Sequence, residues 1–187
     1  MCVDYRWKNE ITQNVVYPMP RIDECLDPMR EARIFTKMDL RSGFHLILIF
    51  TEHRGRTAFQ TRWGTFQYTV IPFGLCNAPA TFQRTMNSLF HEFHQFCEVY
   101  IDDIVIFSKT VAEHASDLRL VRARLEREKF HAKPSKCLFA VPCIDFCGFQ
   151  VSAAGIATQP DKIALIRNWP NPTSVKEVRS FLGVFGF

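Results

Sequence analysis

Hydrophobic residues are sparse at the start of the chain and dominate its pattern from residue 33 onward. Residues 1–32 are polar and interrupted by prolines, and only 21–29 has the spacing of a short helix. Segment 33–39 has apolar residues at Ile34, Phe35 and Met38, as in a short buried strand, and it ends on a carboxylate, Asp39. Another apolar run follows at 44–50. An acidic residue at the end of a buried strand marks this region for closer attention.

The next two segments are rich in residues that favour strands. Segments 56–60 and 65–70 are separated by Trp63 and Gly64. A glycine between two such runs is typical of a tight turn. The pattern therefore predicts a hairpin in which Gly64 takes a positive φ.

Two longer segments have helical periodicity. Apolar residues recur every three to four positions over 78–96, after Asn77 and with Pro79 in the first turn, which is a good helix start. A second helix is predicted over 112–130, with one apolar face, and a third helical segment begins near Ser174.

A hairpin is predicted between these two helices. Two apolar, β-branched runs at 98–101 and 104–107 meet at Asp102 and Asp103, which would form its tip. Segment 137–156 has the pattern of two or three further short strands.

The order of the central elements is strand, helix, strand, strand, helix, strand. That order is typical of an α+β fold in which helices cover one face of an antiparallel sheet, as in ferredoxin-like domains.

Composition places the chain among globular proteins. It has 187 residues, of which 47% are hydrophobic and 22% are charged, so one domain, or one domain and part of another, can bury a core without cross-links. The net charge of +4 permits an anionic partner, but it is smaller than the charge of a dedicated nucleic-acid-binding domain.

The seven cysteines are an odd number at irregular spacing, which predicts reduced thiols inside a cell. Cys137, Cys143 and Cys147 lack the spacing of a zinc site and are interpreted as small buried hydrophobic residues. There is no apolar run long enough for a membrane span and no signal peptide, so we expect a soluble intracellular protein whose compartment is not specified.

Three aspartates carry the candidate chemistry. An Asp-Asp pair is often an ordinary polar turn, but two-residue hairpin loops favour Gly or Asn, and adjacent buried carboxylates require a compensating cation. The strand that ends at Asp39 can pair beside the hairpin and bring its carboxylate to Asp102 and Asp103. Such hard oxygen ligands suit Mg²⁺, which predicts a site for phosphoryl transfer with two ions about 3.5–4 Å apart.

Several strings resemble known motifs. F-T-K-M-D-L-R-S-G-F-H at 35–45, I-P-F-G-L-C-N-A-P-A-T-F-Q at 71–83 and V-Y-I-D-D-I-V-I-F-S at 99–108 resemble the central motifs of reverse transcriptases of Gypsy-type LTR retrotransposons. F-C-G-F-Q-V-S at 146–152 resembles the primer-grip hairpin of this family, and P-T-S-V-K-E-V-R-S-F-L-G at 172–183 resembles the segment after its palm. The Y-I-D-D string differs from the G-D-D of viral RNA-dependent RNA polymerases.

The resemblance implies roles for individual residues. Asp39, Asp102 and Asp103 would be the catalytic acids and would bind two Mg²⁺ ions, for which Mn²⁺ can substitute. The substrate-binding residues would be Phe44, a steric gate against a 2′-hydroxyl, together with Phe73, Gly74 and Lys136. The nucleic-acid-binding residues would be Arg6, Tyr100, Phe146 and Gly148. The implied partners are a primed RNA or DNA template and dNTPs, with no membrane partner; the sequence leaves the oligomeric state open.

The resemblance also implies a division of the chain. Residues 1–32 and 51–72 would be partial fingers, and 33–50 and 73–145 the palm. The remaining parts would be the primer-grip-like hairpin at 146–157 and the truncated start of the thumb or connection at 158–187. Leu46 stands where the family has glutamine, and the fingers are expected to begin upstream of Val3.

Two other patterns have ordinary explanations. In His91-Glu92-Phe93-His94 the histidines are three residues apart rather than the four of a zinc protease, which favours a plain helix surface. A basic face could follow a phosphate backbone or could simply be solvated; it comprises Arg119, Arg122, Arg124, Arg127, Lys129, Lys133 and Lys136.

Two alternatives to a polymerase remain at this stage. One is a catalytically inactive, truncated retroelement remnant that at most binds nucleic acid. The other is a ferredoxin-like RNA-binding module without metal, although such a module would display stacking aromatic side chains where this chain has acids.

Overall fold

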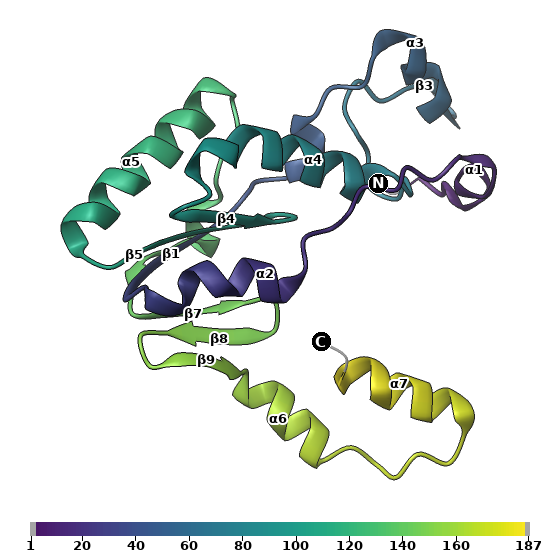
Figure 1. The fold of residues 1–187 in the computed structure, drawn as a ribbon. Helices are drawn as coiled ribbons and strands as arrows, with labels where there is room; N and C mark the ends of the chain where they lie inside the picture. Colours follow the sequence, from purple (N-terminus) through teal and green to yellow (C-terminus); the bar gives the residue numbers. More distant parts are fainter. Residues whose placement is uncertain (1–2, 186–187) are drawn as a thin grey trace.

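The computed structural model describes residues 3–185, so Cys2, one of the cysteines expected to be reduced, lies outside the described residues. Figure 1 shows the fold. The helices are α1 (Arg6–Ile11), α2 (Ile22–Leu26), α3 (Thr51–Arg54), α4 (Ala78–Phe90), α5 (Val111–Arg127), α6 (Pro160–Arg167) and α7 (Val175–Phe185). The strands are β1 (Ile34–Asp39), β2 (Phe59–Thr61), β3 (Gly64–Phe66), β4 (Cys97–Tyr100), β5 (Asp103–Ser108), β6 (Leu138–Val141), β7 (Cys143–Phe146), β8 (Phe149–Ser152) and β9 (Gly155–Thr158). Short 3₁₀ turns are η1 (Asp27–Glu31), η2 (Gly43–Leu46), η3 (Gly55–Thr57), η4 (His91–Phe93) and η5 (Pro134–Lys136).

A four-stranded sheet in the order β4-β5-β1-β6 forms the centre of the molecule. All of its neighbouring strands are antiparallel. Helix α4 connects β1 to β4, and α5 connects β5 to β6, so the predicted order of six elements and the α+β fold class are confirmed.

Both faces of this sheet are buried, because successive side chains of a strand point to opposite sides. Ile104 and Ile106 pack in a first core with residues of α4 and α5. Val105 and Phe107 pack in a second core on the other face, which includes residues of α2, η1, β7 and β8. The expected helical layer is present on one face, and Figure 1 shows that α2 and the β7-β8-β9 sheet cover the other.

The predicted helix over 78–96 is shorter than expected. It begins at Ala78 as predicted, but it ends at Phe90 and continues as η4. The predicted helix over 112–130 begins one residue earlier and ends at Arg127.

The end of α5 has a specific cause. Lys129 adopts a φ of 60°, its backbone N–H donates to the Glu126 carbonyl, and that of Phe130 donates to the Leu125 carbonyl. This is the Schellman arrangement, which terminates a helix and turns the next residue back. Phe130 therefore packs in the first core.

The predicted hairpin at 56–70 is present but short. It consists of β2 and β3 alone, because residues 55–57 form η3 instead of a strand, and Gly64 has the expected positive φ of 125°. Segment 137–156 contributes to four strands rather than two or three.

The C-terminal helices extend away from the sheets (Figure 1). Helix α7 begins at Val175, next to the predicted start, whereas the pattern did not indicate α6. Within residues 3–185, no helix is both long enough and apolar enough to cross a membrane. The division into fingers, palm and following segments stays a prediction.

The interpretation of Cys137, Cys143 and Cys147 as buried hydrophobic residues is correct only in part. Cys25 and Cys97 are buried. Cys137, Cys143 and Cys147 are only half-buried, with Cys137 packed against the first core and Cys147 against the second.

Candidate functional site

Strand pairing brings the three aspartates together at one end of the central sheet. Asp39, the last residue of β1, lies directly opposite Asp103, the first residue of β5. Asp102 immediately precedes Asp103 in the turn between β4 and β5. The antiparallel register thus produces the convergence that the sequence predicts.

The turn itself is shifted by one residue from its predicted position. Tyr100 pairs with Asp103, so the two turn residues are Ile101 and Asp102 rather than Asp102 and Asp103. Ile101 adopts a left-handed conformation with a φ of 52°. Asp103 is consequently a strand residue whose side chain lies on the same face as that of Asp39.

Two lysines neutralise these facing carboxylates. The Lys136 Nζ lies 3.0 Å from Oδ2 of Asp39, and the Lys37 Nζ lies 2.8 Å from Oδ2 of Asp103. Like charges directly opposite one another on a sheet are destabilising, and each lysine offsets one of them. Lys136 therefore lies beside Asp39 at the site, and its role in substrate binding stays a prediction.

Asp102 has a different environment. Its Oδ1 is buried and makes no hydrogen bond, and the pKa of its carboxyl is raised by burial and by the charges of Asp39 and Asp103, while Lys136 opposes the rise. A Cβ on Gly43 would lie 2.5 Å from this oxygen, so the absence of a side chain at Gly43 makes room for it.

Two of the aspartates, Asp39 and Asp102, border an open cavity of about 610 Å³. Its lining consists of Asp39, Leu40, Arg41, Ser42, Gly43, Phe73, Asp102, His131, Ala132, Lys133, Pro134 and Lys136. The cavity is wide enough for a nucleotide-sized ligand. Polar and charged groups from β1, the Asp102 turn and η5 converge on it.

One aromatic ring, that of Phe73, lines this cavity, and two further rings pack behind it. The Phe44 ring is 5.3 Å from that of Phe73 and 5.2 Å from that of Phe82, measured between centroids. Phe73 is 51% exposed, whereas Phe82 is fully buried. Phe44 thus connects the cavity wall to the first core.

Gly74 has a conformation that requires glycine. Its φ is 98°, and its carbonyl accepts a 2.8 Å hydrogen bond from the Asn9 side chain. The Phe73-Gly74 loop is therefore attached to α1.

The predicted nucleic-acid-binding residues are dispersed. Arg6 lies in α1, is exposed and forms an ion pair with Asp4. Tyr100 is half-buried, with its ring edge-on to Phe146. Phe146 is 1% exposed and belongs to the second core, so its ring does not face solvent.

Gly148 lies in the β7–β8 turn. Phe146 pairs with Phe149, and the two intervening residues, Cys147 and Gly148, have φ values of 49° and 83°. This is the geometry of a tight I′-type hairpin. A Cβ on Gly148 would meet no atom within 4 Å, so the glycine serves the backbone conformation.

Two residues of the site were not predicted from the sequence. Lys37 lies between Thr36 and Met38 in β1, two residues before Asp39, and a lysine within a largely buried strand is only a weak signal. Gly43 lies within a motif string, but only the fold reveals which atoms approach it.

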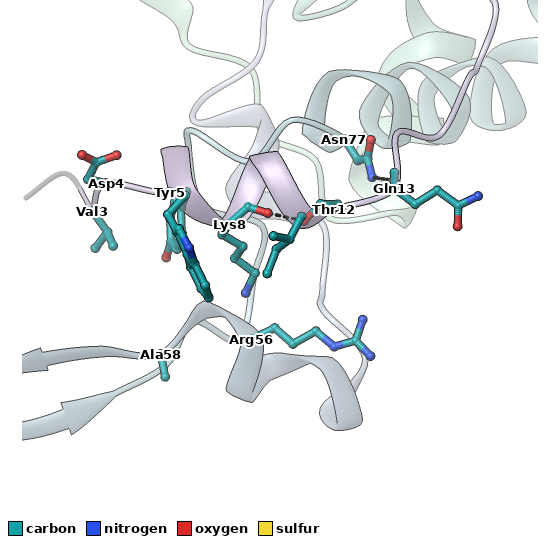
Figure 2. A pocket seen from close by; sticks show the side chains of 11 residues that line it. Val3, Asp4, Tyr5, Lys8, Thr12, Gln13, Arg56, Ala58 and Asn77 are labelled. Atoms are coloured by element: carbon teal, nitrogen blue, oxygen red, sulfur yellow. Dashed lines mark hydrogen bonds between the residues drawn. The ribbon is translucent and has the colours of Figure 1, made fainter.

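A larger cavity, of about 780 Å³, lies away from the aspartates (Figure 2). It is formed between the first residues of the chain, including α1, and residues 56–58, and Lys8 and Arg56 both line it. Burial and the neighbouring Arg56 charge lower the pKa of Lys8. None of the three aspartates contributes to this cavity.

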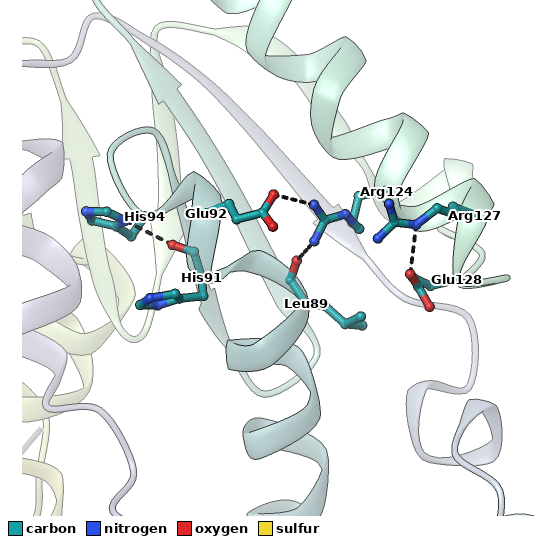
Figure 3. A network of polar contacts seen from close by, with 7 residues as sticks. All are labelled: Leu89, His91, Glu92, His94, Arg124, Arg127 and Glu128. Carbon is teal, nitrogen blue, oxygen red and sulfur yellow. Dashed lines mark hydrogen bonds and ion pairs between the residues drawn. The ribbon is translucent and has the colours of Figure 1, made fainter.

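Three arginines of the predicted basic face form ion pairs within the protein. Arg124 contacts Glu92 at 2.6 Å and also donates to the Leu89 carbonyl, while Arg127 contacts Glu128 (Figure 3). Arg122 likewise pairs with Glu126. These contacts favour the structural interpretation of the basic face.

The His91-to-His94 segment forms η4 and its end. His94 bonds the His91 carbonyl through Nδ1, and Glu92 is held by Arg124 (Figure 3). Between residues 3 and 185, no group of three or more His, Cys, Asp and Glu side chains is arranged to enclose a metal ion.

Comparison with known proteins identifies close relatives. The chain is 41% identical to the Pol polyprotein of Drosophila melanogaster transposon 297 over 186 residues, and 39% identical to that of transposon opus over 188. These matches cover 99% and 100% of this chain, which spans only 18% and 19% of the two relatives.

Solved structures give the same picture. A foamy viral protease-reverse transcriptase in complex with double-stranded DNA superposes with a TM-score of 0.90 at 26% identity, over 100% of this chain and 33% of that one. The same viral enzyme with an RNA/DNA hybrid gives a TM-score of 0.83 at 26% identity, over 98% of this chain and 25% of that chain.

The family assignment rests on most of the chain. Residues 1–151 match the model of the family described as reverse transcriptase (RNA-dependent DNA polymerase). The chain belongs to the reverse transcriptase family.

Proposed function

We propose that this chain is the catalytic segment of a retrotransposon reverse transcriptase, which adds deoxynucleotides to a primer 3′-hydroxyl on an RNA or DNA template. The observation that carries the proposal is the convergence of Asp39, Asp102 and Asp103 at one end of the sheet, where Asp39 and Asp102 line an open cavity. The relatedness to transposon Pol polyproteins and the similarity to a reverse transcriptase solved with nucleic acid support it.

The donor set suits divalent magnesium. Asp39 and Asp102 would be its principal ligands, with Asp103 beside them; two ions would bind, and Mn²⁺ would substitute. Mg²⁺ needs only one or two protein carboxylates when substrate phosphates complete its coordination, so a protein cage of three side chains is unnecessary. The buried, unpartnered Oδ1 of Asp102 offers a free acceptor for this purpose. When bound, the ions would lower the pKa of the attacking hydroxyl and neutralise charge on the leaving pyrophosphate.

The protein's own residues would position the nucleotide. Lys136 lies beside Asp39 at the cavity and carries a cation suited to phosphate oxygens. Phe44, supported by Phe82, would present a flat ring that excludes a 2′-hydroxyl by steric clash. Phe73 and Gly74 would form the wall on which base and sugar rest.

The duplex would contact the surface around the cavity. The Gly148 turn and Tyr100 would lie on the primer side, and Arg6 on the template side. Because the Phe146 ring is buried, it would support the β7–β8 turn from inside, and contact with nucleic acid would come from the turn backbone.

Primer extension tests the proposal. Purified chain, a primed RNA template, dNTPs and Mg²⁺ should give extended primers, and Asp102→Asn should reduce extension by at least about 10³-fold, because it removes a carboxylate required in the transition state. Asp23→Asn, which changes an exposed carboxylate in α2, is the matched control and should extend like the unchanged chain.

Failure is equally well defined. Absence of extension in the unchanged chain, or equal extension in the unchanged chain and Asp102→Asn, would refute the proposed activity. The first outcome, combined with retained nucleic-acid binding, would identify the inactive remnant described above.

A further inference from the structure

The turn that carries Asp102 contains a residue in an unfavourable conformation. Ile101 has a φ of 52°, which is left-handed, and it is β-branched. Residues other than glycine pay about 1–2 kcal/mol for this conformation. Surrounding contacts must therefore hold the turn in place.

A single buried side chain bonds the backbone of the strained residue and of the strand before it. Oε1 of Gln83, in α4, accepts a 2.7 Å hydrogen bond from the Ile101 N–H. Nε2 of Gln83 donates to the Val99 carbonyl at 2.8 Å. The glutamine thus connects the end of β4 to the first residue of the turn.

The orientation of this amide is fixed. Nε2 of Gln83 also donates to Oδ1 of Asn87 at 2.7 Å, and Nδ2 of Asn87 donates to the Tyr17 hydroxyl at 2.9 Å. Rotating the Gln83 amide by 180° would place its NH₂ against the Ile101 N–H and its oxygen against a carbonyl. Gln83 is 0% exposed, so water cannot replace these bonds.

Helix α4 also lies close to the Asp102 carboxylate. Phe82, the preceding residue of α4, and Oδ1 of Asp102 are the nearest atoms to the Cβ position of Gly43. Because Ile101 directly precedes Asp102, the direction of the Ile101 peptide determines where the Asp102 carboxylate points.

We propose that Gln83 is a positioning residue for nucleotidyl transfer, holding Ile101 in its left-handed conformation so that Asp102 faces the cavity. The inference rests on the proposed function. Gln83 does not touch the cavity itself, since it is absent from the cavity lining. It acts through the turn backbone. Two hydrogen bonds of its amide hold Val99 and Ile101, and the third, to Asn87, orients the amide.

Gln83→Met tests this role, because methionine has nearly the same length and removes every hydrogen bond. We expect kcat for primer extension to fall at least about tenfold and the KM for dNTP to change less than about threefold, since the change affects the transition state rather than nucleotide binding. Gln95→Met, at an exposed glutamine, is the matched control and should behave like the unchanged chain.

A second substitution separates positioning from packing. Glycine adopts positive φ without penalty, so in Ile101→Gly the turn should no longer need the hydrogen bonds of Gln83. We expect Gln83→Met to cost less than about threefold in kcat when measured in the Ile101→Gly background. Equal losses in both backgrounds would overturn the inference, as would unchanged kcat in a Gln83→Met protein that melts like the unchanged chain.

Hydrogen exchange provides a readout that does not require polymerase activity. The Ile101 amide should exchange at least about tenfold faster in Gln83→Met, while amides of β1 and β5 keep their protection. If the unchanged chain extends no primer, the proposed function fails. Separately, an Ile101 amide that exchanges equally fast in Gln83→Met and in the unchanged chain would refute the hold of Gln83 on the turn. If Gln83→Met does not fold, Asn87→Ala takes its place, because it removes the acceptor that orients the Gln83 amide, together with the bond to Tyr17. We expect lower kcat and faster Ile101 exchange in Asn87→Ala, and no change in either would overturn the inference.

Discussion

Individual residues around the aspartates determine the charge of the site. Lys37 pairs with Asp103 and Lys136 pairs with Asp39, whereas the buried Oδ1 of Asp102 has no hydrogen-bond partner. Burial raises the pKa of Asp102, whereas Lys136 lowers it. The position with the strongest need for a cation is therefore the tip of the turn, next to the cavity.

Gly43 provides a test at this scale. A methyl group there would lie 2.5 Å from Oδ1 of Asp102 and 2.9 Å from the Phe82 ring, so Gly43→Ala must relieve both of these contacts by displacing atoms. We expect a loss of about 1–3 kcal/mol in the free energy of unfolding and at least about a tenfold loss of primer extension, which corresponds to about 1.4 kcal/mol of transition-state stabilisation.

The same substitution at Gly183 serves as control. No atom lies within 4 Å of its Cβ position, and the residue is in α7. Gly183→Ala should stabilise the protein by up to about 1 kcal/mol, as helix propensity predicts, and urea unfolding measures both variants. A Gly43→Ala protein with full stability and activity would contradict the tight contact.

Phe44 allows a test of nucleotide selection. Replacing Phe44 by Ala removes the ring between Phe73 and Phe82. We expect the ratio of kcat/KM for rNTP to that for dNTP to rise by about tenfold or more, because a clash that disfavours the 2′-hydroxyl disappears. Phe50→Ala, at a ring that is 78% exposed, should leave the ratio unchanged; an unchanged ratio in Phe44→Ala would argue for a purely structural ring.

Among the elements, β1 has the most extensive connections. It pairs with β5 and β6, and a buried histidine of α5 attaches to it from one side. Nε2 of His114 lies 2.7 Å from Oγ1 of Thr36, and Nδ1 lies 3.0 Å from Oγ of Ser108. Thr36 also accepts from the Ala140 N–H, and Ser108 donates to Asp117. This network favours a neutral His114 with its proton on Nδ1, since the Thr36 hydroxyl is then free to donate to Nε2.

This network predicts a pH dependence of stability. Burial lowers the pKa of His114 in the folded protein, and Asp117 only partly opposes this. An unfolded histidine titrates near pH 6.5, so the unfolded state binds more protons and stability falls as the pH drops below about 6.5.

His114→Gln identifies the contribution of the imidazole. We expect the unfolding free energy of the unchanged chain to decrease more steeply between about pH 6.5 and pH 5 than that of His114→Gln, as measured by urea unfolding at several pH values. Parallel pH profiles for the two proteins would show that His114 does not titrate across this range.

At the scale of the whole molecule, one sheet is buried between two cores. The first core joins it to α4 and α5, and the second joins it to α2 and the β7-β8-β9 sheet. The aspartates lie where β1 ends and β5 begins. The rigidity of the site therefore depends on both cores. Loss of packing in either core would leave one face of the sheet that carries the aspartates unsupported.

Phe146 tests the second core. Its ring is 1% exposed within that core, and Phe146→Ala should lower the free energy of unfolding by about 3–5 kcal/mol. Phe139→Ala, at a ring that is 52% exposed, should cost less than about 1 kcal/mol. Similar urea midpoints for the two variants would contradict the assignment of Phe146 to the interior.

The sequence by itself determined the order of the central elements, the start of α4 at Ala78 and the strand that ends on Asp39. Periodicity and capping are local properties, so short segments contain enough information for them. It also predicted that Asp39 would meet Asp102 and Asp103, because antiparallel pairing of two short strands allows few other arrangements.

The tertiary structure alone decided the details that make this convergence a site. The turn residue is Ile101, against its own conformational preference, because Gln83 from another element supplies hydrogen bonds that outweigh the strain. Lys136 reaches Asp39, and Gly43 makes room for Asp102, through contacts between residues distant in the chain. Local pattern contains no information about such pairs, since their energy arises only when the chain has folded.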